Sequence, residues 1–311
     1  MRPGAMLSGK KVLITGHTGR IGEAIAERFA PVCEMWGLAR YSREGSWEEA
    51  IARGITPVRG SMGSDSFAEL PTDFDYVLNI AAAIHPATTQ EGIIDNCDGP
   101  ARLMGHCRNA RAFLHVSTVS VHHYSDDERH VYSEESALGS GIGSAYGVSK
   151  LAGEGAVRAG AILLDMPTVI CRQNVQYGGA HPDANVFEQV IDRFLETGEV
   201  PVPADRKYYC SADYLYDIPD WVEPCLEFAA VPATVVNWCG DEPIDWLELF
   251  DYIGWMVGKA PIFVKTDKFP FPNSIQDPSR RQSIAGRART DWREGFRRSL
   301  EMRHPDLSLR T

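Results

Sequence analysis

The chain has 311 residues and a formal net charge of −11, which is too acidic for the broad basic surface that nucleic acid requires. Hydrophobic residues make up 44% of it and charged residues 23%, as in ordinary globular proteins with a large core. Its first residues do not form a signal peptide, no apolar run reaches the roughly 18 residues of a membrane span, and its seven cysteines include no Cys-x-x-Cys pair. We therefore expect a cytoplasmic protein with reduced thiols that binds neither nucleic acid nor membrane.

The first expected element is a short apolar strand, Val12–Ile14, which leads into a glycine-rich turn and a helix over 23–29. The G-x-x-G-x-x-G spacing of the turn is typical of dinucleotide binding. Such glycines allow a sharp turn, a close approach to a pyrophosphate and close packing of the helix on the sheet. The alternative is an ordinary strand-to-helix turn. The cofactor-binding residues predicted here are Gly16, Thr18, Gly19, Arg20, Ile21 and Gly22.

A second strand is expected over 34–39, and Arg40 follows it directly. An acidic residue near this point would bind the ribose hydroxyls of NAD, whereas a basic residue suits the 2′-phosphate of NADP. Arg40, with Arg43 close by, therefore favours NADP as the cofactor, and NAD is the alternative. A solvated loop arginine is the other interpretation of Arg40.

Further strands are expected at 58–61, 74–80 and 112–116, with a helix at 96–107. Strands that alternate with helices over the first 170 residues predict an α/β fold with a Rossmann-type, doubly wound parallel sheet. Ligands of such sheets bind beyond the carboxyl ends of the strands. The small side chains of Ala81, Ala82 and Ala83 would let the backbone lie against a cofactor there.

Tyr146 and Lys150 are four residues apart, so on a helix they share a face. A lysine ammonium beside a phenol stabilises the phenolate and lowers the pKa of the tyrosine. Ser117 and Thr118, at the end of the fifth strand, offer a hydroxyl to hold a substrate oxygen. These groups suit proton transfer to or from an alcohol or ketone while a hydride moves to or from nicotinamide.

The motifs together resemble those of the extended short-chain dehydrogenases/reductases, the NAD(P)-dependent epimerase/dehydratase family. TGHTGRIG (15–22) resembles the family's T-G-x-x-G-x-x-G, and YGVSKLAGE (146–154) is close to its Y-g-x-S-K-x-x-x-E. DYVLNIAA (75–82), HVSTVSVH (115–122) and CRQNVQYGG (171–179) resemble three further motifs. The resemblance places Thr118 at the catalytic Ser/Thr position, with Ser117 just before it.

The resemblance implies an NAD(P)(H)-dependent oxidoreductase that interconverts a secondary alcohol and a ketone. Tyr146 would be the acid/base, Lys150 its electrostatic partner, and Thr118 with Ser117 the donor to the substrate oxygen. The alternatives are a nucleotide-sugar 4-epimerase with tightly bound NAD and a non-catalytic dinucleotide sensor. The resemblance also implies a homodimer formed through helices near Asn96 and Tyr146.

Several positions depart from the family's patterns. Val119-Ser120 stand where dehydratases place Asp-Glu, and Ser120 also stands where other members place a catalytic Cys or Glu. His122 replaces a tyrosine, and Ser61 replaces the usual aspartate near the adenine. These departures leave simple redox chemistry or 4-epimerisation and remove water elimination.

We predict a dinucleotide-binding domain over 1–174 and 211–240 and a smaller substrate-binding lobe over 175–210 and 241–311. Asn174 and Arg206 are the predicted substrate-binding residues, and the expected substrate is a small molecule such as a sugar or sugar nucleotide. The position of Arg206 depends on an alignment through Asp213; an alignment through Asp217 puts Cys210 there and counts against a nucleotide sugar. The histidines at 122, 123 and 130 lie beside a solvated acidic loop, so we expect no metal site.

Overall fold

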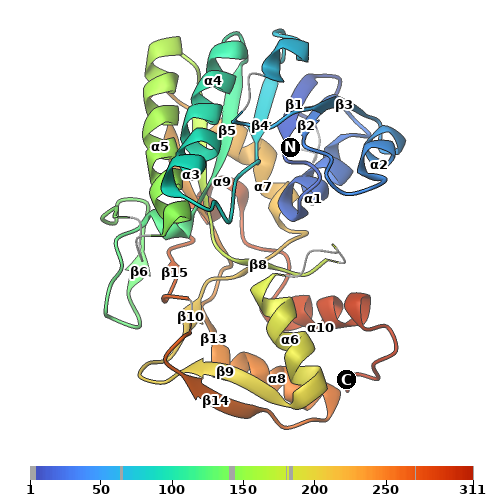
Figure 1. Cartoon of the computed structure of the whole chain (residues 1–311), viewed down its shortest axis with the longest axis vertical. Coiled ribbons are helices and arrows are strands. Elements are labelled where there is room, and N and C mark those ends of the chain that lie inside the picture. The colour runs from blue at the N-terminus through green and yellow to red at the C-terminus, as the bar shows by residue number, and fades with distance from the viewer. Residues whose placement is uncertain are drawn as a thin grey trace.

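The computed structural model describes residues 5–63, 66–139, 144–179, 181, 185–269 and 271–310. A sheet covered by helices on both faces forms the larger part, and a smaller lobe lies beyond one end of the strands (Figure 1). This arrangement agrees with the expected α/β fold with a second lobe.

The central sheet has seven parallel strands in the order β12-β7-β5-β4-β1-β2-β3. The chain crosses over between β3 and β4, so β1 has β2 on one side and β4 on the other. The strands are β1 (Lys11–Thr15), β2 (Glu34–Ala39), β3 (Ile55–Arg59), β4 (Tyr76–Asn79), β5 (Ala112–Thr118), β7 (Thr168–Gln173) and β12 (Thr234–Trp238). The five strands expected up to residue 118 are thereby confirmed, with shifts of up to three residues at their ends.

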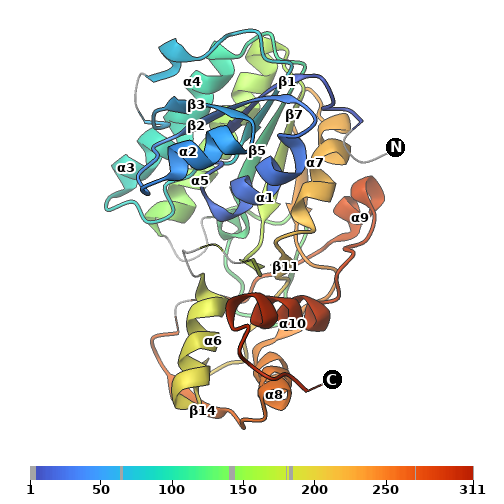
Figure 2. The same ribbon diagram turned by 90° about the vertical axis from the view of Figure 1, so that its right-hand side faces the viewer.

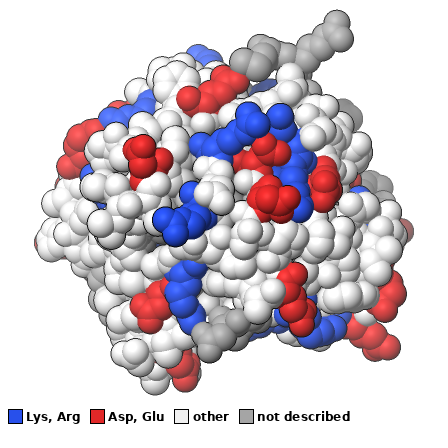
Figure 3. Space-filling model, turned by 90° about the horizontal axis from the view of Figure 1, so that it is seen from above, with Lys and Arg blue, Asp and Glu red and all other residues white. Residues whose placement is uncertain are grey.

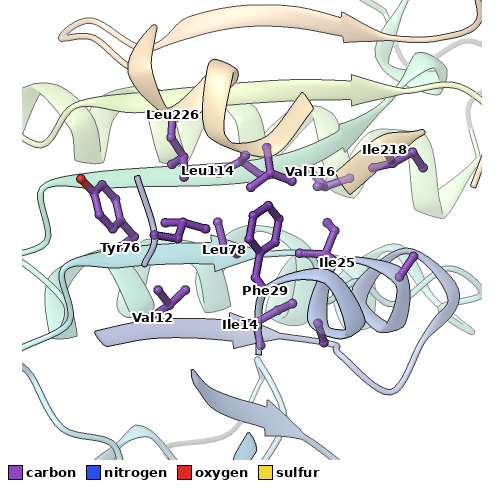
Figure 4. Close-up of a cluster of buried hydrophobic side chains, with 14 of the residues drawn as sticks. Val12, Ile14, Ile25, Phe29, Tyr76, Leu78, Leu114, Val116, Ile218 and Leu226 are labelled. Carbon is purple, nitrogen blue, oxygen red and sulfur yellow. The ribbon is translucent and has the colours of Figure 1, made fainter. Parts of the chain in front are cut away.

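Helices α1 (Arg20–Phe29), α7 (Ile218–Glu227) and α9 (Ser279–Ala285) cover one face of the sheet, and α2 (Ser46–Ala52) packs on β3 (Figure 2). Alternate residues of the strands point to this face, because side chains in a strand alternate in direction. Figure 4 shows how Ile25 and Phe29 of α1 and Ile218 and Leu226 of α7 meet these strand residues. The strand residues labelled there are Val12, Ile14, Tyr76, Leu78, Leu114 and Val116.

The other face is covered by α3 (Thr89–Ile93), the π-helical turn η2 (Ile94–Asp98), α4 (Gly99–His106) and the long helix α5 (Ala145–Leu164). One helix had been expected over 96–107, but it is interrupted at its start by the π turn. The carbonyl oxygen of Asn96 lies where a side chain at Gly153 of α5 would begin, 2.1 Å from an added Cβ. Gly153 therefore allows α5 to pack directly on the backbone of η2.

The lobe has an aromatic core built from two separate stretches of the chain. The first contains β8 (Gln176–Tyr177), α6 (Val186–Thr197), β9 (Glu199–Pro203), β10 (Tyr209–Cys210) and β11 (Asp213–Tyr214). The second contains β13 (Ile244–Asp245), α8 (Trp246–Val257), β14 (Ile262–Thr266), β15 (Ile275–Gln276) and α10 (Trp292–Arg303). Tyr177 stacks on Phe296 with ring centroids 4.0 Å apart, and Phe187 contacts Trp246, so both stretches are needed to complete this core.

One helix packs outside the part of the chain expected for it. Helix α9 falls inside the range 241–311 that had been assigned to the lobe, but it packs on α7 and β12 of the sheet.

On the face of the molecule shown in Figure 3, basic and acidic side chains lie intermixed. Among the described residues, no helix is long and apolar enough to cross a membrane.

Candidate active site

A cleft of about 630 Å³ lies at the carboxyl ends of β1, β2, β3 and β4. This volume is typical of cofactor and substrate pockets. One wall comes from the sheet, and Gln176 and His181 from the start of the lobe complete it. The structure brings together here every residue predicted in the glycine turn as well as Arg40, Ala81, Ala82 and Ala83.

The three glycines of the turn have different reasons to be glycine. Gly16 has φ +70°, and a Cβ there would lie 2.8 Å from the backbone of Ala81; at Gly22 it would lie 2.2 Å from the carbonyl oxygen of Gly16. These two positions are fixed by contacts within the protein. At Gly19 a Cβ would meet only ordinary contact at 3.5 Å. Gly19, the N-cap of α1, is therefore the position at which an absent side chain leaves room for a ligand.

The residues around the turn fit a dinucleotide. The first N–H groups of α1 have no partner within the helix and, with the helix dipole, suit a pyrophosphate. Thr15 Oγ1 accepts hydrogen bonds from the N–H groups of Ile80 and Ala81, each at 3.1 Å. Asn96 Oδ1 accepts one from the N–H of Ala83 at 2.8 Å. The backbone along the cleft is therefore held in place by side chains of the sheet and of η2.

Asn96 contributes to the site although the sequence analysis gave it no role of its own. Its side-chain amide donates to the carbonyl oxygen of Ala83 at 3.0 Å and to Ser149 Oγ at 3.0 Å, and Ser149 in turn bonds the carbonyl of Tyr146. Asn96 thus connects the cofactor-lining segment to the helix that carries Tyr146 and Lys150. The π turn that presents it has no sequence signal of its own.

The adenosine end of the cleft contains the two arginines after β2. Arg40 is exposed and lines the cleft. Arg43 forms a two-point ion pair with Glu49. Tyr41 lies between them at φ +52°, and its hydroxyl donates to the carbonyl of Gly37 at 2.9 Å. Arg40 is therefore better placed than Arg43 to meet the ribose side of a dinucleotide.

Thr118 and Tyr146 come together as expected. Thr118 ends β5 and Tyr146 lies in the first turn of α5. Burial raises the pKa of Tyr146, and the interaction with the Thr118 side chain opposes this rise only in part. The lowered tyrosine pKa expected from Lys150 is therefore not found, since the lysine ammonium donates instead to the carbonyl oxygen of Val116 at 2.7 Å.

Lys150 is buried one helical turn beyond Tyr146. Its burial lowers the pKa of the ammonium to about 8, although the charge of Glu154 acts in the opposite direction. A lysine in this state carries its charge at neutral pH and loses it a little above.

Ser117 points to the opposite face of β5 from Thr118. Its hydroxyl donates to Glu154 Oε1 at 2.6 Å, and Glu154 forms a buried two-point ion pair with Arg172. The structure thus places the predicted catalytic residue Ser117 in a buried polar cluster rather than beside Tyr146. The alternation of side chains along a strand explains the difference.

The two predicted substrate residues do not lie together. The side chain of Asn174 takes part in four hydrogen bonds within the chain, with Val175, with Gln276 and with the backbone and side chain of Ser274. Arg206 donates to the carbonyl of Phe271 at 3.0 Å and lines a separate hollow of the lobe. Asp217, the residue of the second possible alignment, is the N-cap of helix α7, which begins at Ile218.

The histidines at 122 and 130 flank Tyr132. His122 stacks on that ring with centroids 5.0 Å apart, and His130 meets it edge-on. Within the described parts of the chain, no group of three or more His, Cys, Asp or Glu side chains is arranged to hold a metal ion.

The parallel sheet and the glycine turn define a dinucleotide-binding protein of the Rossmann type. The sequence model of the NAD dependent epimerase/dehydratase family matches residues 12–223. The chain belongs to this family, and the resemblance to the extended short-chain dehydrogenases/reductases is confirmed. It is accordingly an enzyme of an NAD-dependent family.

Solved structures with the same fold include several epimerases. The UDP-glucuronic acid 4-epimerase of Bacillus cereus, in complex with NAD, has a TM-score of 0.78 and 21% identity over 94% of this chain and 96% of its own. MoeE5, in complex with UDP-glucuronic acid and NAD, has a TM-score of 0.80 and 20% identity over 96% and 100%. The UDP-N-acetylglucosamine 4-epimerase of Methanobrevibacter ruminantium has a TM-score of 0.82 and 17% identity over 96% and 100%. A comparison with curated protein sequences gave no match.

Proposed function

We propose that the chain is a nucleotide-sugar 4-epimerase that uses NAD. The observation that carries the proposal is the meeting of Thr118, at the end of β5, with Tyr146 in the first turn of α5, with Lys150 one turn further along that helix. The structural neighbours that bind UDP-sugars together with NAD support the substrate class. This reaction had been the alternative to a simple oxidoreductase in the sequence analysis.

The chain's own residues would hold the dinucleotide along the cleft. The glycine turn would receive the phosphates, Arg40 would lie at the ribose of the adenosine, and Ala81, Ala82 and Ala83 would form the wall below. The chemistry that NAD would supply when bound is the reversible acceptance of a hydride from the substrate carbon. No acidic pair follows Thr118, so the residues support oxidation and reduction without elimination of water.

In this proposal Tyr146 removes the proton from the substrate's C4 hydroxyl and later gives it back. Thr118 holds the same oxygen through its hydroxyl. The charge of Lys150 favours the deprotonated form of Tyr146 once the ammonium turns from Val116 toward the phenol. Ser117 holds Glu154 and acts only on the structure of the site.

The two stretches that build the aromatic core form the substrate lobe. We propose that this lobe binds the nucleotide sugar on the side that faces the nicotinamide. Asn174 and Arg206 remain proposed substrate contacts, and the support for this is their position at the lobe. Neither is needed for the chemical step.

The test is incubation with UDP-glucuronic acid, UDP-glucose and UDP-N-acetylglucosamine, with the C4 epimers resolved by proton NMR. Tyr146→Phe is the matched variant, because it removes one oxygen from the site. General acid–base catalysis contributes about 10²–10⁴-fold, so turnover should fall by that order while NAD binding is kept. A wild-type protein that binds NAD but converts none of these sugars would contradict the substrate class. Full activity in Tyr146→Phe would contradict the assignment of the base.

The second candidate is an NADP(H)-dependent oxidoreductase that releases a ketone, and Arg40 is the observation that favours it. A guanidinium in the cleft suits the 2′-phosphate of NADP. Net formation of free NADPH with a secondary alcohol distinguishes this reaction from epimerisation, which leaves the cofactor unchanged. A dinucleotide sensor would bind the cofactor and show neither reaction.

A homodimer through α4 and α5 is part of the proposal. These helices lie side by side (Figure 1), and both carry exposed glycines, Gly105 and Gly155, whose added Cβ would meet nothing within 4 Å. Gly155 lies in the middle of α5, where a glycine costs about 1 kcal/mol relative to alanine, and the single chain gives no reason for it. Ile162 and Leu163, 59% and 83% exposed on α5, add apolar surface for a second copy to cover.

A further inference from the structure

Arg20 occupies the first position of α1, directly after Gly19, the N-cap of that helix. Its backbone belongs to the predicted phosphate site, but its guanidinium is directed toward the lobe. It donates to Glu188 Oε1 at 2.7 Å and to the carbonyl oxygen of Gly178 at 2.6 Å. A positive charge is thus held next to the cleft by a carboxylate from another part of the chain.

The Arg20–Glu188 pair is buried, with side-chain exposures of 8% and 2%. Glu188 is fixed from two further directions. Its Oε2 accepts the N–H of Asn185 at 2.7 Å in the capping box of α6, and its Oε1 accepts the N–H of Gly178 at 3.2 Å. The carboxylate is therefore held rigidly, and the charge of Arg20 is neutralised whether or not a ligand is bound.

Buried charges interact over longer distances than exposed ones, because the protein interior screens them less than water does. A dinucleotide brings two negative charges to the turn. Arg20 attracts these charges and Glu188 repels them, and in the native protein the two effects offset each other.

We propose that Glu188 sets the affinity for the dinucleotide by offsetting the charge of Arg20 at the phosphate site. The inference rests on the proposed binding of the dinucleotide at the glycine turn. It makes Arg20 and Glu188 positioning and charge-balancing residues, which act on the phosphates through the field of the pair. The effect concerns the pyrophosphate, so it is the same for NAD and NADP, unlike the effect of Arg40.

The experiment compares the native protein with variants that remove one or both charges. Isothermal titration measures the affinity of each for NAD and for ADP-ribose, which shares the pyrophosphate and lacks nicotinamide. Glu188→Gln keeps the capping box, since glutamine serves at this position as well. It removes the carboxylate charge beside Arg20, and the affinity should rise about tenfold, the order that one nearby charge contributes. Arg20→Met leaves the carboxylate alone, and the affinity should fall by a similar factor.

The double variant, Arg20→Met with Glu188→Gln, should return the affinity to near the native value. Thermal unfolding of each variant records the cost to the fold, which is expected in both single variants.

A purely structural pair would weaken binding in both single variants, and that result, or equal affinity in all four proteins, would overturn the inference. If Arg20→Met does not fold, the direction of change in Glu188→Gln decides. A native protein that binds neither NAD nor ADP-ribose would instead contradict the proposed function. The two failures are therefore distinguishable.

Discussion

Arg40 and Arg43 follow the same strand three residues apart, yet the structure gives their guanidinium groups different surroundings. Both line the cleft, but the guanidinium of Arg43 is also held in an ion pair with Glu49. A charge-assisted hydrogen bond to a phosphate is worth about 1.5–3 kcal/mol. Only Arg40 should therefore contribute this energy to the binding of NADP.

We expect Arg40→Asp to change the choice of cofactor. The aspartate repels a 2′-phosphate and accepts hydrogen bonds from the ribose hydroxyls of NAD. The ratio of the NADP and NAD dissociation constants should rise by at least about tenfold. Titration of both cofactors measures it, with Arg43→Ala as the control that leaves the ratio close to native. An unchanged ratio in Arg40→Asp would show that Arg40 is a solvated loop residue.

At this scale the sequence predicted the residues whose role depends on the backbone or on helical spacing. The glycine turn and the Tyr146/Lys150 pair belong to this group, because their spacing carries the information. Ser117 and Asn96 could not be assigned in the same way. The direction of Ser117 depends on the strand continuing to Thr118, and Asn96 is brought to the site by a π turn.

Among the elements, helix α5 packs against the sheet on one side and is exposed on the other. Val157 and Ala161 are fully buried against the sheet, while Gly155, Ile162 and Leu163 are exposed. The periodicity of the sequence predicts the buried side. It does not predict what covers the exposed side, because an exposed apolar stripe has the same pattern whether or not a partner is present.

If α5 lies in a dimer interface, Gly155→Arg should give a monomer, because the side chain would enter space that the second copy occupies. Sedimentation velocity or light scattering at several concentrations measures the change. Glu196→Arg, at an exposed position of α6, is the matched control and should leave the mass unchanged. A native protein that is monomeric at all concentrations would contradict the proposed interface, and in that case Gly155→Ala should stabilise the fold.

For the molecule as a whole, buried histidines should limit stability in acid. Burial lowers the pKa of His122 to about 3, with smaller contributions from the charges of Arg172 and His130. Both ring nitrogens of His122 are buried, without a hydrogen-bond partner in the part of the chain that the structure describes. The unfolded chain binds a proton below pH 6.5 and the folded chain does not, so stability falls as the pH falls from about 6.5 toward 3.

We expect His122→Phe to weaken this dependence, since phenylalanine keeps the stack on Tyr132 and does not titrate. The free energy of unfolding should fall less steeply with acid, by about 1.4 kcal/mol for each pH unit in that range. Urea unfolding at pH 7, 6 and 5 measures the slope. His123→Phe, at the exposed neighbouring position, should leave it unchanged, and equal slopes in all three proteins would contradict the role of His122.

The overall division into a sheet and a lobe could be predicted, but the details of the lobe could not. Its strands have two to five residues, too few for a clear alternation, and their partners are distant in sequence. Asn174 illustrates the result, because its side chain bonds Ser274 and Gln276, just before β15 and within it, about a hundred positions later.

The two stretches of the lobe are separated in sequence by α7 and by β12, an edge strand of the large sheet. A contiguous exchange that covers only one of the two stretches would therefore transfer half of an aromatic core, with Tyr177 from one parent and Phe296 from the other. Transfer of the whole lobe without that segment needs three crossovers, one before the first stretch and one on each side of the segment that returns to the sheet. New substrate preferences in such a chain should accordingly arise more readily by point substitution within the lobe than by exchange of the lobe as a block.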